Sequence, residues 1–188
     1  MAIYHFSGTV ISRSQGRSAV ACIAYRTGER LLDERSQKVH DYTKKQDIAF
    51  SEILLPENVP SRFKDRETLW NEVERVEKRK DSQLAREIQI SLPKELSLEQ
   101  NIALAREFVK KEFVSQGMIA DMAIHLDKSA DGESQPHVHV MLSLREVNES
   151  GFGNKVRSWN AKENLLSWRE SWAEVANHHL ALNGYDIT

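Results

Sequence analysis

The sequence predicts an α+β protein with a central antiparallel β-sheet and helices packed mainly on one face of that sheet. Several segments alternate between apolar and polar residues, which indicates half-buried strands. Other segments are amphipathic and carry helix start and stop signals. The resulting order, β-α-α-β-α-β-β-α, is typical of an antiparallel sheet covered by helices. A length of 188 residues suits one domain with a real core, so we expect a single domain over 1–188.

The first part of the chain predicts one strand and two helices. Residues 2–12 alternate between apolar and polar side chains and should form a strand. We expect a helix over about 17–32, with glycine and serine near its start, and an amphipathic helix over 66–81. The segment 33–66 is polar and contains two prolines, so it is expected to be irregular.

The second part predicts three strands and two helices. Residues 85–92 alternate and should form a strand. The helix over 97–117 begins at a serine that has a glutamine three residues later, and it stops at a glycine. The strands 118–126 and 137–147 are expected to pair as a long hairpin, and 160–183 should form the last helix.

The composition narrows the class of protein. Hydrophobic residues make up 40% and charged residues 29%, which is average for a soluble globular chain. No apolar run approaches the ~20 residues that span a bilayer, and a single cysteine excludes an internal disulfide and fits a reducing cytosol. The net charge of −2 argues against a protein that coats nucleic acid. Positive charge is nevertheless concentrated near the start of the chain. Residues 1–32 carry a single acidic residue, Glu29, against Arg13, Arg17, Arg26 and Arg30.

Three histidines are expected on one polar face of the sheet. Side chains at i and i+2 share a face, so His137 and His139 point the same way, and pairing of the hairpin can bring His125 beside them. Opposed residues lie ~5 Å apart, which suits three imidazoles on one divalent cation. Such a cation keeps positions open for water or substrate. The alternative is that these are ordinary surface histidines on the face that the helices leave open.

Tyr25 lies on a face of small residues in the predicted first helix. Its neighbours at helical spacing are Ser18, Ala21 and Gly28, which leave room for a bulky group to approach the phenol. A tyrosine beside arginines can attack a phosphate, because cations stabilise the charge of the transition state. The alternative is a half-buried tyrosine that serves packing alone.

Two further polar residues fall on the same predicted face. Glu87 could accept a proton from Tyr25 or hold a metal-binding histidine in orientation, and the alternative is a solvated carboxylate. His5 could line the site or be a hydrogen-bonded bystander.

Four segments in order resemble the relaxases of the MobA/MobL type, and especially their TraA-like branch. The segments are MAIYHFS, GRSAVACIAYR, QLAREIQISLPKELSLEQNIALAREFV and PHVHVML. They extend over nearly the whole chain. The resemblance implies the HUH endonuclease fold, in which a central antiparallel sheet carries a histidine-hydrophobe-histidine pair on a central strand.

The resemblance also implies an activity. The family nicks one DNA strand at the origin of transfer of a plasmid through a 5′-phosphotyrosyl link and a free 3′-hydroxyl, and the step is reversible. The matching residues are Tyr25 as nucleophile, His125, His137 and His139 as ligands of a divalent metal such as Mg²⁺ or Mn²⁺, and Glu87 at an acidic position. Some members have a second acid where this chain has Gln89, which leaves the general base open.

Contacts with single-stranded DNA follow from this interpretation. The expected DNA-binding residues are Arg13, Arg17 and Arg26 near Tyr25, His5, and Arg157 with Trp159. The alternative for the last two is a loop packed on the final helix. The resemblance further implies conjugation accessory proteins and a type IV secretion coupling protein as partners. It places the protein in the bacterial cytoplasm, with export to the recipient, and suggests that the chain is the N-terminal fragment of a longer protein.

Three rival interpretations remain at this stage. A rolling-circle replication initiator uses the same chemistry, but there the tyrosine usually follows the histidine pair, whereas Tyr25 precedes it. A three-histidine metal hydrolase would use water and form no covalent adduct. A binding domain with a decayed site is disfavoured, because the tyrosine and all three histidines are intact.

Overall fold

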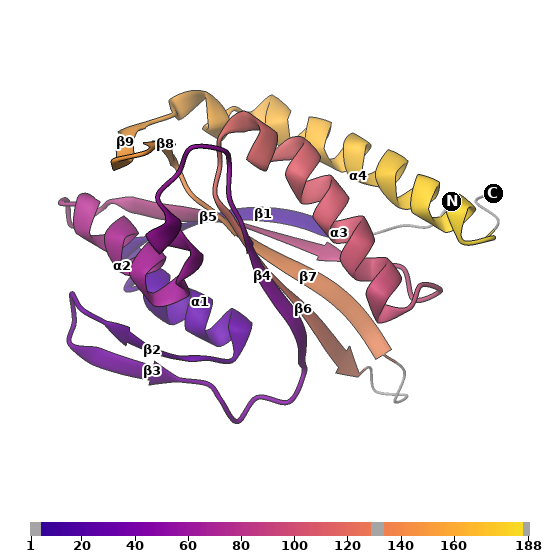
Figure 1. Ribbon diagram of the computed structural model, residues 1–188, viewed down its shortest axis with the longest axis horizontal. Coiled ribbons are helices and arrows are strands. Elements are labelled where there is room, and N and C mark those ends of the chain that lie inside the picture. The colour runs from indigo at the N-terminus through magenta and orange to yellow at the C-terminus, as the bar shows by residue number, and fades with distance from the viewer. Residues whose placement is uncertain (1–4, 129–133, 186–188) are drawn as a thin grey trace.

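The computed structural model describes residues 5–128 and 134–185, and its centre is a five-stranded antiparallel sheet (Figure 1). The strand order is β1-β5-β7-β6-β4, so β7 lies in the middle. The strands are β1 (Phe6–Ser12), β4 (Ile48–Leu54), β5 (Gln83–Ser91), β6 (Ala120–Lys128) and β7 (Ser134–Leu142). The predicted fold class and the predicted hairpin of β6 and β7 are confirmed.

Four α-helices and two short hairpins surround the sheet in the described part of the chain. The helices are α1 (Ala19–Thr27), α2 (Arg66–Val76), α3 (Leu98–Glu112) and α4 (Lys162–Leu182). The hairpins are β2 (Arg30–Asp33) with β3 (Lys38–Asp41), and β8 (Arg145–Asn148) with β9 (Gly151–Lys155). None of the described helices is both long and apolar enough to cross a bilayer.

The first face of the sheet is apolar and is covered by the two longest helices, α3 and α4, which lie side by side (Figure 1). Alternate side chains of β5 and β7, such as Ile90 and Val138, are fully buried there. Phe108 of α3 meets Trp172 of α4 edge to face, with ring centroids 5.1 Å apart. The alternation in the sequence predicted this layer correctly.

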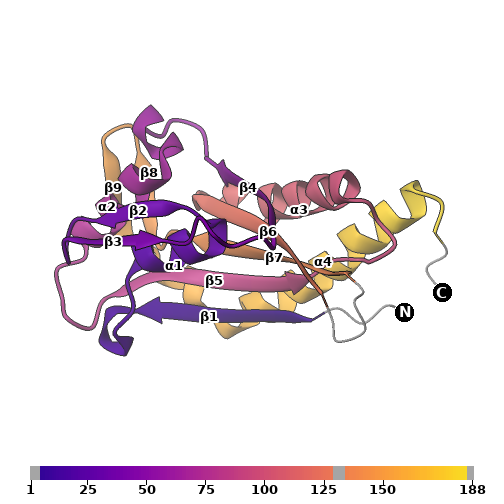
Figure 2. The same cartoon turned by 90° about the horizontal axis from the view of Figure 1, so that it is seen from below.

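The second face carries polar side chains, and α1, α2 and the β2–β3 hairpin lie on that side (Figure 2). Ile23 of α1, Trp70 of α2 and Met141 of β7 belong to a second buried cluster. Asp121 of β6 is buried beside it and accepts hydrogen bonds from Arg66, both at 2.8 Å, and from Trp70 Nε1 at 2.9 Å. The face expected to be open is therefore partly covered, and its buried charge is paired.

The segment 33–66 is more regular than predicted. It contains β3 and β4, and β4 is the edge strand that pairs with β6. The predicted helix 17–32 is shorter in the structure, because Gly28 adopts a left-handed conformation with φ 68° and ends α1. The chain then turns into β2 at Arg30.

Other boundaries differ at the ends of elements. The helix predicted over 97–117 has the expected capping box but ends at Glu112 and continues as a short 3-10 turn. The strand predicted over 137–147 ends at Leu142, and Arg145 begins the separate hairpin β8–β9.

Candidate active site

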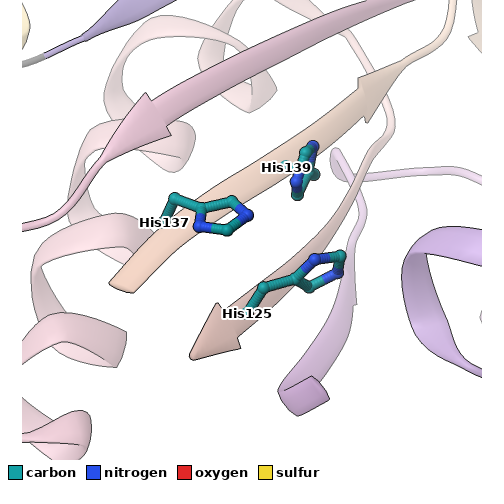
Figure 3. A group of neighbouring side chains, drawn as sticks. All are labelled: His125, His137 and His139. Atoms are coloured by element: carbon teal, nitrogen blue, oxygen red, sulfur yellow. The ribbon is translucent and has the colours of Figure 1, made fainter. Parts of the chain in front are cut away.

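Three histidines meet on the polar face of the sheet. His125 of β6 and His137 of β7 are directly paired, and His139 lies two residues further along β7. Their ring centroids are 4.5, 4.9 and 5.2 Å apart, and one ring nitrogen from each lies within 4.8 Å of the others. Figure 3 shows the rings gathered around a common point. The structure thus brings together all three predicted ligands.

Each histidine has one ring nitrogen beside a hydrogen-bond acceptor. The pairs are His125 Nε2 with the carbonyl oxygen of Arg26 at 2.7 Å, His137 Nδ1 with the carbonyl oxygen of Gln135 at 3.1 Å, and His139 Nδ1 with Glu87 Oε1 at 3.3 Å. Carbonyl and carboxylate oxygens only accept, so a neutral imidazole carries its proton on that nitrogen. The lone pair then lies on Nδ1 of His125 and on Nε2 of His137 and His139, as a metal site requires.

Burial keeps two of these imidazoles neutral. The exposed fractions of His125 and His139 are 3% and 4%. Burial lowers the pKa of His139 to about 4, although the hydrogen bond to Glu87 opposes this shift. Burial also lowers the pKa of His125. Because metal ligands must be deprotonated, both residues are in the binding form at neutral pH.

Glu87 and Arg26 connect the tyrosine helix to the histidines. Glu87 is buried, and its Oε1 lies 2.7 Å from the guanidinium of Arg26 as well as close to His139. Burial alone would raise the pKa of Glu87, but the hydrogen bonds and charges of His139 and Arg26 outweigh it and hold the pKa below its usual range. Arg26 also offers its carbonyl oxygen to His125 of β6, so one residue of α1 contacts one histidine directly and reaches His139 of β7 through Glu87 of β5.

Tyr25 stands next to Arg26 at the surface, with 43% of its side chain exposed. Its ring packs edge to face on Tyr42 at 5.1 Å, and Lys45 Nζ lies 3.5 Å from its centroid. Ser18 and Ala21 line an open pocket of ≈ 350 Å³ beside the phenol, together with Tyr25 itself. The predicted free space around the tyrosine is therefore present.

Arg13, which was predicted to contact DNA, makes its hydrogen bonds within the fold. Its guanidinium donates to the Glu74 carboxylate at 2.7 Å and to the carbonyl oxygens of Glu77 and Arg79. Its side chain is only 8% exposed. The guanidinium of Arg26 is likewise paired inside the protein, with Glu87. Of the three arginines predicted to bind DNA, Arg17 and Arg26 line the pocket, and Arg17 is the more exposed, with 34% of its side chain accessible against 22% for Arg26.

The remaining predicted DNA-binding residues lie apart from one another. His5 is exposed just before β1, and its carbonyl oxygen accepts from Ser91, the residue that pairs with His137. Trp159 packs against the apolar cluster under α3 and α4, on the face opposite the histidines. Arg157 is exposed in the same 3-10 turn before α4. Trp159 thus packs as the alternative interpretation of this turn expects, whereas Arg157 stays accessible and its contact with DNA stays a prediction.

Three residues near the site were missed because they follow β3 in a segment predicted to be irregular. They are Tyr42 and Lys45, which contact Tyr25, and Asp47, whose Oδ2 lies 3.8 Å from His125 Nδ1. The run HDYTKKQD over 40–47 concentrates functional side chains and was the available signal.

The donor set fits a divalent metal ion. Three imidazoles with fixed tautomers converge on one point, and Asp47 adds negative charge nearby. Imidazole nitrogens suit several divalent ions, and a three-ligand site leaves positions for oxygen atoms of a substrate. Next to a surface tyrosine, this arrangement suits nucleophilic attack on a phosphate.

Comparison with known families decides the class of protein. A profile of the MobA/MobL family matches residues 17–188, which include the tyrosine helix and both histidine strands. The chain belongs to the MobA/MobL family. The resemblance seen in the sequence is thereby confirmed.

Named relatives of this family member are conjugation and mobilization proteins. It is 38% identical over 218 residues to the conjugal transfer protein TraA of Agrobacterium fabrum (strain C58 / ATCC 33970), covering 100% of the chain and 19% of TraA. It is 40% identical over 215 residues to the mobilization protein MobL of Acidithiobacillus ferridurans, covering 98% of the chain and 56% of MobL. The chain thus spans less than two thirds of either relative.

Solved structures support the same assignment of the fold. A structure described as "Molecular Basis of Vancomycin Resistance Transfer in Staphylococcus aureus" is 41% identical, with a TM-score of 0.89 over 99% of this chain and 96% of that one. The conjugative relaxase TrwC, in a metal-bound complex with origin-of-transfer DNA, gives a TM-score of 0.62 at 11% identity over 98% of this chain and 72% of that one. The second likeness shows the fold alone, which is the predicted HUH relaxase fold.

Proposed function

We propose that this domain is a DNA relaxase that nicks single-stranded DNA at a plasmid origin of transfer by tyrosine transesterification. One observation carries the proposal. A single helix holds the exposed Tyr25 and, through the adjacent Arg26, contacts a triad of histidines whose tautomers are fixed for metal binding. The conjugation and mobilization names of its relatives support the same role.

The proposed reaction exchanges one phosphodiester bond for another. The Tyr25 oxygen attacks the scissile phosphorus, and the bond from phosphorus to the 3′ oxygen breaks as the new bond forms. The 3′ oxygen takes a proton and leaves as a hydroxyl. The phenolic proton passes to solvent, which reaches Tyr25 directly because the side chain is exposed. The 5′-phosphotyrosyl link retains the bond energy, so the reverse reaction religates the strand.

The residues around Tyr25 have distinct proposed roles. His125, His137 and His139 would hold Mg²⁺ or Mn²⁺, which when bound polarises a phosphate oxygen as a Lewis acid. Glu87 keeps His139 in orientation, and its low pKa makes it a weak proton acceptor. The sequence left two roles open for Glu87, accepting the proton of Tyr25 or orienting a histidine, and the low pKa favours the second.

Lys45 is proposed to stabilise the reacting phenol. Its ammonium lies over the Tyr25 ring, where a positive charge favours the phenolate as nucleophile and as leaving group in religation. The accessory proteins, the coupling protein and export with the DNA remain proposals that rest on the conjugative relatives.

The deciding experiment mixes the protein with Mn²⁺ and a randomised pool of single-stranded DNA. We expect a DNA–protein band that survives SDS and disappears in Tyr25→Phe. Tyr185→Phe is the matched control, because Tyr185 is similarly exposed at 41% but follows the end of α4. Cleavage without an adduct would favour a three-histidine hydrolase. Absence of both adduct and cleavage would favour a binding domain.

A further inference from the structure

The pocket beside Tyr25 extends along α1 towards the start of that helix. One side is formed by α1 residues on a single helical face, including Ala21 and Cys22. The other side is formed by the β2–β3 hairpin, including Lys38 and His40. Its volume of ≈ 350 Å³ is at the lower end of the range for small-ligand pockets, roughly 300–1,000 Å³. A single nucleotide is a ligand of suitable size.

The far end of the pocket is suited to an anion. Arg17 and Lys38 both line it and carry positive charge. The N-terminal amides of α1 do not contribute, because Glu74 accepts from Ala19 N–H and Ser18 accepts from Ala21 N–H. One nitrogen of the Arg17 guanidinium, Nη2, donates a 3.4 Å hydrogen bond to Cys22 Sγ and lies 3.9 Å from Glu87 Oε2, and the side chain is 34% exposed. Arg17 therefore retains hydrogen-bonding capacity for a phosphate.

A polar atom in the pocket wall lacks a hydrogen bond within the described structure. His40 Nε2 is shielded from solvent, and its neighbour Asp33 Oδ2 is 3.8 Å away. The Asp33 carboxylate already accepts from the Ser18 hydroxyl at 2.7 Å and from the Arg35 amide at 3.1 Å. A shielded polar atom without a partner is costly, and a ligand in the pocket can supply that partner.

The walls of the pocket are tied to one another before any ligand binds. The Ser18 hydroxyl accepts from the Ala21 amide at 3.2 Å, which caps α1, and donates to Asp33 at the end of β2. This connection fixes the hairpin against the helix, so the pocket is preformed. Tyr42 adds an aromatic surface at the mouth, next to Tyr25.

We propose that this pocket binds one nucleotide of the single-stranded DNA beside the nick. Its phosphate would lie near Arg17 and Lys38, and its base would meet His40. The inference rests on the proposed function and adds a base-reading subsite to it. A nucleotide held here places a neighbouring phosphate close to Tyr25, which lines the same pocket.

The test measures binding without cleavage. Tyr25→Phe protein in EDTA selects from a random single-stranded DNA library, and the enriched sequences are compared with those of Tyr25→Phe/His40→Leu. We expect one position of the enriched sequence to lose its base preference while the others keep theirs. The affinity for the best sequence should fall about 5- to 20-fold, the usual cost of one base contact. His178→Leu is the control, because this exposed histidine lies on α4.

A second measurement tests the phosphate contact. Lys38→Gln should lower the slope of log affinity against log salt by about 0.7, the value for one phosphate of a single strand. Lys111→Gln, an exposed lysine on α3, should leave the slope unchanged.

The outcomes distinguish failure of the proposed nucleotide pocket from failure of the proposed nicking activity. Unchanged base preferences in the His40 variant, with an adduct still formed by wild type, would overturn the pocket alone. A preference that depends on His40, without any adduct from wild type and Mn²⁺, would support the pocket and overturn the nickase. Absence of measurable binding to single-stranded DNA would overturn both.

Discussion

On the face of the sheet covered by α3 and α4, Phe108 and Trp172 close an apolar layer in which shape and area matter most. On the opposite face, buried charges and histidines are held by specific hydrogen bonds, as in Asp121 with Arg66 and Glu87 with Arg26. Burial of apolar area stabilises the first face, whereas orientation of polar groups dominates the second. The difference indicates that one face provides the rigid support and the other carries the chemistry.

The largest expected effect on stability comes from the apolar face. Phe108→Ala should lower the free energy of unfolding by about 3–5 kcal/mol, because the ring is fully buried among other aromatic rings. Urea unfolding measures the loss. Adduct formation by the folded fraction at low temperature should be unchanged, and a specific loss of nicking would contradict the division between the faces.

On the polar face, by contrast, a substitution should remove adduct formation rather than stability. His139→Ala removes one of three ligands, so Mn²⁺ affinity should fall by more than the roughly 10- to 100-fold that loss of a ligand's hydrogen-bond partner costs, and the DNA adduct should disappear. Titration calorimetry gives the affinity, with His178→Ala as control. An adduct yield within twofold of wild type would show that this triad is not the metal site.

Acid should destabilise the metal-free protein through the polar face. The pKa of His139 is about 4 in the fold and about 6.5 when unfolded, so the unfolded state binds more protons below pH 6.5. Stability should therefore fall as the pH drops from 6.5 towards 4, by roughly 2 kcal/mol at pH 5, at about 1.4 kcal/mol per pKa unit. Urea midpoints in EDTA at pH 5 and 7.5 measure this loss. In His139→Leu the difference between the two pH values should shrink, and an equal difference in both proteins would contradict the assignment.

The smallest of these effects concerns Lys45. Lys45→Met should slow adduct formation about tenfold, since a partly exposed charge near the phenol contributes modestly. Lys45→Arg should restore most of the rate, and Lys44→Met should have little effect because that neighbour is exposed. Equal rates for both methionine variants would remove Lys45 from the proposed mechanism.

The sequence predicted the parts of the structure that repeat a local pattern. Alternation located β5, β6 and β7 and divided their residues correctly between the two faces. That alternation placed the three histidines on one face, whereas the register that pairs His125 with His137 was known only from the structure. Capping signals likewise located α3.

What could not be predicted depends on contacts between distant segments. β4 is an edge strand with mostly half-buried side chains, so its sequence shows no clear alternation. Composition does not distinguish Arg13, which is paired with Glu74, from Arg17, which lines the pocket. The nearness of Lys45 to Tyr25 likewise arises only when the chain folds back after β3.

The central claim is that Tyr25 becomes covalently linked to DNA, and mass spectrometry of the adduct tests it most directly. Trypsin should release the peptide SAVACIAYR, residues 18–26, in which Tyr25 is the only tyrosine. We predict that the nucleotide remnant is attached to this peptide through a 5′ phosphate. A remnant on VHDYTK, residues 39–44, would assign the attack to the neighbouring Tyr42 and contradict the account.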